Sequence, residues 1–234
     1  MKKLLTMVFL LCLPMPIKAQ ESIYFIHGFM RSASSMKKMA KAFQKQDYET
    51  YLWNYPSSSQ TIEEHSQLLV EELQKCAQHH KGEPIHFVTH SLGGIILRAA
   101  LNHPDCPEEA KIGRAVLLAP PNQGSRFARF LNRFKLMRKI LGRKSGYQLL
   151  TTDTFDHLGQ FPEKLDVLII SGTFGWNPIV KEKNDGKVGL SETILTTPHR
   201  QITVPCGHSW IMCSSNVIKH SLDFVSKSKP SNVD

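Results

Sequence analysis

The sequence predicts an α/β domain in which helices flank a mostly parallel, doubly wound central sheet. Short β-rich runs alternate with amphipathic runs of helical length along most of the 234 residues, and parallel strands need such helical crossovers. The chain is 41% hydrophobic and 21% charged, which excludes collagen-like and disordered proteins and provides enough apolar side chains for a sizeable core.

The N-terminal residues are typical of an export signal. Lys2 and Lys3 precede an apolar run over residues 4–13, and two prolines and Ala19 follow it. The run is about half as long as the ~20 residues that a membrane span needs. We therefore expect a cleaved signal peptide over residues 1–19 and a secreted or periplasmic protein.

Six strands and four helices are expected in the rest of the chain. Buried β-branched and aromatic runs predict strands over residues 22–27, 50–54, 85–89, 115–119, 167–171 and 201–204. Apolar residues at three- and four-residue spacing predict helices over residues 36–46, 61–79, 92–102 and 209–225. Thr61 and Glu64 form a capping box at the start of the second helix, and a proline at position 104 follows the end of the third.

The segment 122–163 is too long for a simple connection between a helix and a strand. Between Gly124 and Lys144 it has eight basic residues and no acidic one. Apolar residues recur among them at helical spacing, namely Phe127, Phe130, Leu131, Phe134, Met137 and Leu141. We expect a basic amphipathic helix within a helical cap inserted into one domain over residues 20–234. Two interpretations stay open: a lid that binds an anionic lipid surface, and a peripheral helix with solvated charges.

The charge and the cysteines limit the partners and cofactors. The formal net charge is +9, but no segment resembles a base-reading module, so we expect no nucleic-acid partner. Export would leave four cysteines in an oxidising compartment, with Cys206 and Cys213 as the favoured disulfide pair. Their spacing does not fit a metal site. We expect the three tryptophans to pack inside the protein or, for Trp176, to line the substrate site.

The run Thr89-His90-Ser91-Leu92-Gly93-Gly94 lies between a predicted strand and a predicted helix. A sharp turn at this place presents a serine hydroxyl as a nucleophile, and small neighbours let the helix and strand approach each other. Gly93 fits this pattern, whereas Thr89 stands where a glycine is usual. Ser91 is therefore the candidate nucleophile.

An activated serine needs an oxyanion hole, a base and an orienting acid. Phe29, in the turn after the first strand, and Leu92 are the expected oxyanion donors through their backbone N–H groups. His208 is the expected base because it follows the last strand directly, whereas His220 lies inside the last helix. Asp185, in a glycine turn, is the expected acid. Its competitors are Glu182 and Glu192.

With these motifs, the chain resembles the α/β-hydrolase superfamily, and within it the small exported lipase- and esterase-like members. The resemblance rests on His-Gly-Phe at 27–29, His-Ser-Leu-Gly-Gly at 90–94, Asp-Gly-Lys-Val at 185–188 and Gly-His-Ser at 207–209. It implies a three-layer α/β-hydrolase sandwich with a cap.

The resemblance also implies that Ser91, Asp185 and His208 hydrolyse carboxylic esters through an acyl-enzyme, with Phe29 and Leu92 as oxyanion donors and without a cofactor or metal. The alternatives are a thioesterase, amidase or acyltransferase on the same triad, or a catalytically silent scaffold that binds a lipid or a protein. The expected partner is an ester or lipid substrate. We make no prediction of the oligomeric state.

Overall fold

Six parallel strands form a single sheet in a computed structural model that describes residues 20–226. Their order across the sheet is β2-β1-β3-β4-β5-β6. They are β1 (Ser22–Ile26), β2 (Glu49–Trp53), β3 (Ile85–His90), β4 (Arg114–Leu118), β5 (Asp166–Gly172) and β6 (Arg200–Val204). The predicted signal peptide over residues 1–19 lies outside the described residues. The direction of winding reverses between β1 and β3, where ligands bind in open parallel sheets.

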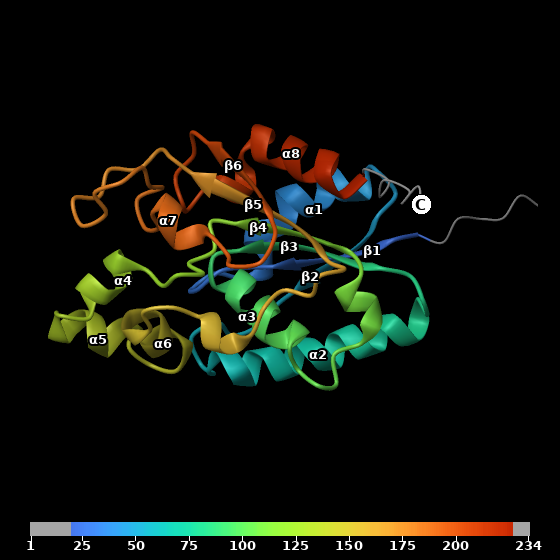
Figure 1. The fold of residues 1–234 in the computed structure, drawn as a ribbon, viewed down its shortest axis with the longest axis horizontal. Coiled ribbons are helices and arrows are strands. Elements are labelled where there is room, and N and C mark those ends of the chain that lie inside the picture. The colour runs from blue at the N-terminus through green and yellow to red at the C-terminus, as the bar shows by residue number, and fades with distance from the viewer. Residues whose placement is uncertain (1–19, 227–234) are drawn as a thin grey trace, which may run out of the picture.

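Helices cover both faces of this sheet (Figure 1). One face carries α2 (Ile62–His79) and α3 (Leu92–Leu101), and the other carries α1 (Lys37–Gln44) and α8 (Ser215–Ser226). The side chains of β1 alternate between the two layers of core, with Tyr24 and Ile26 on the α2 side and Ile23 and Phe25 on the α1 side. This double burial explains why the four central strands β1, β3, β4 and β5 are mainly apolar runs, whereas the edge strands β2 and β6 are more exposed.

The remaining helices are short. They are α4 (Arg126–Leu131), α5 (Lys135–Leu141), α6 (Ser145–Thr151) and α7 (Leu190–Thr193), with 3-10 turns η1 (Ala33–Met36), η2 (Glu108–Lys111), η3 (Asp156–Leu158) and η4 (Ile211–Cys213). The predicted capping box of α2 is present: Thr61 Oγ1 accepts from the Glu64 amide at 3.1 Å, and Glu64 Oε2 accepts from the Thr61 amide at 2.7 Å. These bonds satisfy two N–H groups that the helix itself leaves free.

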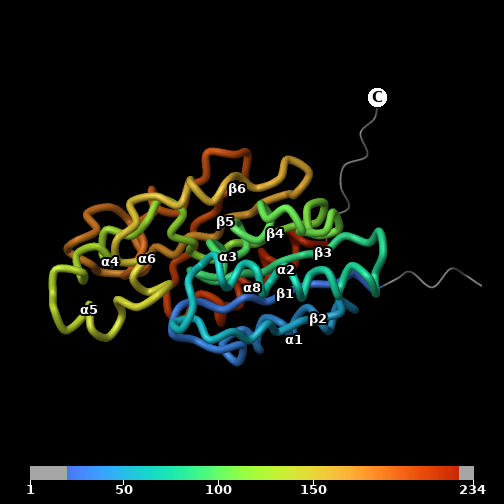
Figure 2. The backbone as a smooth tube through the Cα atoms, turned by 90° about the horizontal axis from the view of Figure 1, so that it is seen from below, coloured from blue at the N-terminus to red at the C-terminus, as the bar shows by residue number. Residues whose placement is uncertain are grey.

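The segment between β4 and β5 is helical, but the expectation of one long basic helix is wrong. Helices α4 and α5 are separated at residues 132–134, where Phe134 has an extended backbone with φ −96° and ψ 121°. The break lets Phe127 and Leu131 of α4 and Leu141 of α5 line one cavity, which a single straight helix would not allow. Helices α4, α5 and α6 gather at one end of the molecule (Figure 2).

The last predicted helix also begins later than expected. Residues 209–214 form turns and η4, and α8 starts only at Ser215. The backbone of Ser214 is extended, with ψ 128°, and the carbonyl of Cys213 accepts a hydrogen bond from Lys38 Nζ. The turns carry the chain from the end of β6 back to α8.

The expectation of a disulfide is wrong, since the structure has Cys76, Cys106, Cys206 and Cys213 as free thiols. Cys206 and Cys213 belong to separate turns, in which their amides donate to Val204 and Trp210 respectively. Cys76 and Cys106 are buried in the core on the α2 side.

The expectation for the tryptophans is correct only for Trp53, which packs against that core and stacks on Tyr55 at 4.5 Å. Trp176 and Trp210 are 90% and 70% exposed. Both follow strands of the sheet, in the loops after β5 and β6.

Candidate active site

Ser91 stands at a strained turn between β3 and α3. Its φ of 52° and ψ of −120° lie in a region that residues with a Cβ rarely adopt. Its amide donates to the Leu118 carbonyl at 2.9 Å, which ties the turn to β4. A Cβ at Gly93 would lie 2.6 Å from the Ile26 carbonyl oxygen. Glycine at this position therefore lets the first turn of α3 lie against the end of β1.

Thr89, where a glycine is usual, is accommodated by Gly94. A Cβ at Gly94 would lie 3.1 Å from Thr89 Oγ1. The threonine hydroxyl is buried and has no hydrogen-bond partner in the part of the chain that the structure describes. The second glycine of the run thus supplies the space that the threonine takes.

Asp185, His208 and Ser91 form one chain of hydrogen bonds. The distance from Ser91 Oγ to His208 Nε2 is 3.1 Å, and that from His208 Nδ1 to Asp185 Oδ2 is 2.6 Å. Asp185 Oδ1 accepts from the amides of Lys187 and Val188 at 3.0 and 2.8 Å. Because the carboxylate of Asp185 can only accept hydrogen bonds, His208 Nδ1 carries the proton and donates a hydrogen bond to Oδ2. Nε2 then has a free lone pair that can accept the serine proton.

Glu182 and Glu192, the two competitors of Asp185 for the role of the acid, bind Arg126 instead of His208. Arg126, at the start of α4, donates from its amide and from Nε to Glu192 Oε1 at 2.6 and 2.9 Å, and it also pairs with Glu182. Glu182 and Glu192 thereby connect the helical insertion, the segment 122–163 between β4 and β5, to the segment between β5 and β6 that carries Asp185. His220 is exposed on α8.

His90 holds the backbone of the base, a contact that the sequence analysis missed. Its Nε2 donates to the His208 carbonyl at 3.0 Å, and the two rings lie 4.9 Å apart. Burial, and next the charge of His208, hold the pKa of His90 well below its usual value. The residue is thus a neutral donor. The sequence offered one signal for this role, namely that His90 directly precedes the candidate nucleophile Ser91.

The two expected oxyanion donors are the amides of Phe29 and Leu92. Among the described residues, no acceptor is found for the Phe29 amide, and Leu92 opens α3 without an intrahelical acceptor. His27, before Phe29, is buried; its Nδ1 donates to the Gly28 carbonyl at 3.0 Å and its ring stacks on Tyr55 at 4.2 Å. His27 therefore braces the turn.

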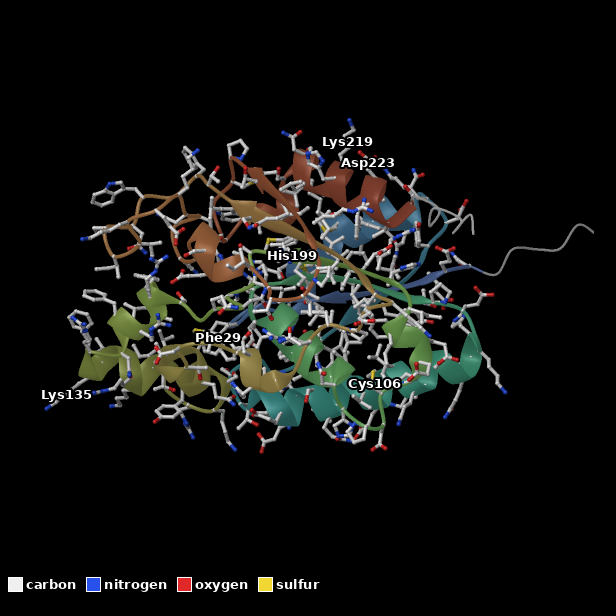
Figure 3. The ribbon with its side chains drawn as sticks, in the orientation of Figure 1. Phe29, Cys106, Lys135, His199, Lys219 and Asp223 are labelled. Carbon is white, nitrogen blue, oxygen red and sulfur yellow. The ribbon has the colours of Figure 1, made fainter. Side chains whose placement is uncertain are left out.

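A cavity of about 210 Å³ opens at Ser91 and His208. Two cations, Arg31 and Lys187, lie in its wall, and no carboxylate is among its described lining residues. Its apolar wall comes mainly from the insertion, through Phe127, Ala128, Leu131, Leu141, Leu149 and Leu150. Figure 3 shows Phe29 between the sheet and α6. The site can thus hold a hydrocarbon group beside the serine.

Comparisons with known proteins show the family of the chain. A family model described as serine aminopeptidase, S33, matches residues 17–167, more than half of the chain. The chain belongs to this family of the α/β-hydrolase superfamily. As a member, it is expected to be a hydrolase. The match includes Ser91 but ends before Asp185 and His208, whose placement therefore rests on the structure. No curated protein matches the sequence.

Solved structures of lipases and esterases share the hydrolase fold. The chain is similar to the mature form of a Bacillus licheniformis lipase, with a TM-score of 0.68 and 22% identity over 90% of this chain and 91% of the lipase. For the propeptide form the TM-score is 0.74, with 20% identity over 94% of this chain and 53% of the other. The chain thus spans about half the length of the propeptide form. A metagenomic carboxyl esterase gives a TM-score of 0.65 and 16% identity over 83% of this chain and 66% of its own.

Within residues 20–226 two other features are not found. No helix is both long and apolar enough to cross a membrane. No group of three or more histidine, cysteine or acidic side chains could hold a metal ion.

Proposed function

We propose that this protein is a serine hydrolase that cleaves carboxylic esters of lipase or esterase type. The observation that carries the proposal is the hydrogen-bonded chain from Asp185 through His208 to Ser91 at the mouth of an apolar cavity. A hydrocarbon acyl group would occupy the cavity, because its walls offer mainly apolar contacts. The expected signal peptide adds the proposal that the enzyme is exported.

The reaction would proceed in two halves. His208 Nε2 takes the proton of Ser91 while Oγ bonds to the ester carbonyl carbon, and the amides of Phe29 and Leu92 bind the oxyanion. The bond to the alcohol then breaks, and His208 gives its proton to the leaving oxygen. In the second half, water gives a proton to His208 and bonds to the acyl carbon, the bond from that carbon to Ser91 Oγ breaks, and His208 gives the proton to Oγ, which releases a carboxylic acid and free Ser91. Asp185 stays ionised and stabilises the charged imidazole.

Amide cleavage is the second candidate, because the matching family is described as serine aminopeptidase. An aminopeptidase substrate carries an ammonium group, which a carboxylate in the site would bind. The cavity presents Arg31 and Lys187 instead, and no carboxylate among its described lining residues. This charge favours an ester over a peptide with a free amino end.

The first test is labelling of the purified protein with a fluorophosphonate probe, with the adduct located by mass spectrometry. We expect one adduct, on Ser91, which is lost in Ser91→Ala and in His208→Ala although both variants stay folded. Nitrophenyl esters from acetate to palmitate would then give the chain-length preference, and an aminoacyl nitroanilide would test amide cleavage. A folded wild-type protein that neither labels nor hydrolyses esters, with or without detergent, would favour the catalytically silent scaffold.

We also propose that the outer surface of the insertion binds anionic lipid. Leu136 and Ile140 on α5 are 62% and 54% exposed, and Lys135 points outward from the same helix (Figure 3). No carboxylate within residues 20–226 lies within 4 Å of Lys135. The same holds for four further basic side chains: Arg133, Arg138, Lys139 and Arg143. A face that is both basic and apolar suits an anionic bilayer.

Sedimentation with vesicles tests this surface. We expect binding to vesicles that contain phosphatidylglycerol, weaker binding to pure phosphatidylcholine, and a loss of at least about thirtyfold in affinity for Lys135→Glu/Lys139→Glu, because each of the two cations near such a surface contributes ~1 kcal/mol. Lys219→Glu on α8, whose side chain is exposed on another face (Figure 3), is the matched control. Equal binding by both variants would contradict the assignment of the surface.

A further inference from the structure

Two cations stand beside the proposed catalytic groups. Arg31 follows Phe29 by two residues in the turn after β1, and Lys187 follows Asp185 by two residues in the loop after β5. Both side chains line the cavity that contains Ser91 and His208. The turn and the loop that form the site thus each bring one positive charge to it.

Neither charge is neutralised in the part of the chain that the structure describes. No described carboxylate lies within 4 Å of either residue. Arg31 donates to the Ser209 carbonyl at 2.8 Å, which fixes its guanidinium next to the segment of the base. Asp185, the acid nearest to Lys187 in sequence, is buried and bonded to His208.

The two cations also repel each other. Burial, and next the positive charge of Arg31, lower the pKa of Lys187. The charge of Asp185 acts on Lys187 in the opposite direction and offsets part of this repulsion, but Asp185 forms no ion pair with it, so two like charges that face one space still raise the free energy of the empty site. An anion between them would relieve this repulsion and would accept hydrogen bonds from both side chains.

A second, polar hollow begins where the apolar cavity ends. It has a volume of about 390 Å³, and Arg31 and Lys187 belong to the walls of both spaces. Its other polar lining comes from the hydroxyls of Ser32, Ser34 and Ser35. The cations therefore separate an apolar region that suits a hydrocarbon chain from a polar region, in which Ser35 Oγ donates to the Ser32 carbonyl and the hydroxyls of Ser32 and Ser34 bond each other.

We propose that Arg31 and Lys187 form an anion subsite that binds a phosphate group on the alcohol portion of the ester substrate. This inference rests on the proposed ester hydrolysis. The acyl chain fits the apolar wall, so the charged group must belong to the alcohol that leaves the acyl carbon in the first half of the reaction. A phosphate matches the site better than a carboxylate, because it offers more oxygen acceptors to the guanidinium and the ammonium.

A matched pair of substrates tests the subsite: 1-octanoylglycerol 3-phosphate and 1-octanoylglycerol. We expect the wild type to have a kcat/KM for the phosphate at least about tenfold above that for the neutral ester, as charge-assisted hydrogen bonds imply. The ratio of the two values should fall by about tenfold in Lys187→Gln and further in Arg31→Gln/Lys187→Gln. Lys183→Gln, an exposed lysine of the same loop, is the control and should keep the wild-type ratio.

The outcomes separate the two proposals. Turnover of both esters with the same ratio in wild type and in the double variant would overturn the subsite and leave ester hydrolysis standing. No turnover of either ester by the wild type would overturn the proposed function. Calorimetry with octyl phosphate and Ser91→Ala then tests the subsite by itself: a Kd that rises about tenfold on adding Lys187→Gln supports it, and an unchanged Kd overturns it. Inorganic phosphate in a parallel titration shows whether the free ion suffices.

Discussion

Replacing Asp185 by asparagine should lower kcat for a nitrophenyl ester by about 10⁴-fold while the protein stays folded. The carboxylate accepts from His208 Nδ1 at 2.6 Å and so keeps the accepting nitrogen, Nε2, towards Ser91. An asparagine amide can donate to Nδ1, and the imidazole then carries its proton on the nitrogen that should act as the base. A change of this kind in a Ser-His-Asp triad costs ~10⁴ in kcat. The measurement is steady-state kinetics together with circular dichroism.

Asp153→Asn is the matched control for this variant. Asp153 belongs to the insertion, pairs with Arg129 at 3.2 Å, and its side chain is 86% exposed. It should keep kcat within about twofold of the wild type, because an exposed ion pair contributes little to stability. If Asp185→Asn retained more than a tenth of the wild-type kcat, another group would have to orient His208, and the proposed triad would be wrong.

Gly93→Ala should produce the largest loss of stability among the single substitutions considered. A Cβ at this position would lie 2.6 Å from the Ile26 carbonyl oxygen and 2.7 Å from that of His27. These are backbone atoms of β1 and its turn, so they cannot move aside as a flexible side chain would. We expect the free energy of unfolding in urea to fall by about 3 kcal/mol or more, since overpacking against a rigid neighbour is at the upper end of single-residue effects.

Gly94→Ala, one residue further along α3, separates this contact from a general effect of alanine. Its Cβ would lie 3.1 Å from Thr89 Oγ1 and 3.2 Å from Pro120 Cβ, where small side-chain shifts suffice. Alanine also gains about 1 kcal/mol over glycine within a helix. The variant should stay within about 1 kcal/mol of the wild type. Equal losses in the two variants would show that the close approach of α3 to β1 does not limit stability.

The sheet and the order of the site residues could be predicted because local patterns determine them. Each of the six strands was expected to within one residue at either end. All six contain β-branched or aromatic residues, and the four central strands are also buried on both faces. The glycines after Ser91 and the positions of Asp185 and His208 after strands placed all three residues at the carboxyl edge of the sheet, where the structure brings them together.

Features that depend on tertiary contacts could not be predicted from the sequence. The helical pattern continues from α4 into α5, so no local signal marks the break at residues 132–134. The roles of Arg31, Lys187 and His90 likewise follow from which loops meet at the site. A basic residue in a turn has no periodic signal, and its lack of a counter-ion appears only when the neighbouring segments are in place.

The ion pairs of Arg126 have a mechanical consequence for access to Ser91. They bind the first turn of α4 to Glu182 and Glu192 in the loop of Asp185, so a rigid swing of the whole insertion would break them and pull on the proposed acid. Helix α5 has no buried residue and ends at Leu141, before Gly142. Displacement of this outer helix alone would leave those ion pairs intact, and with them the geometry of the proposed triad.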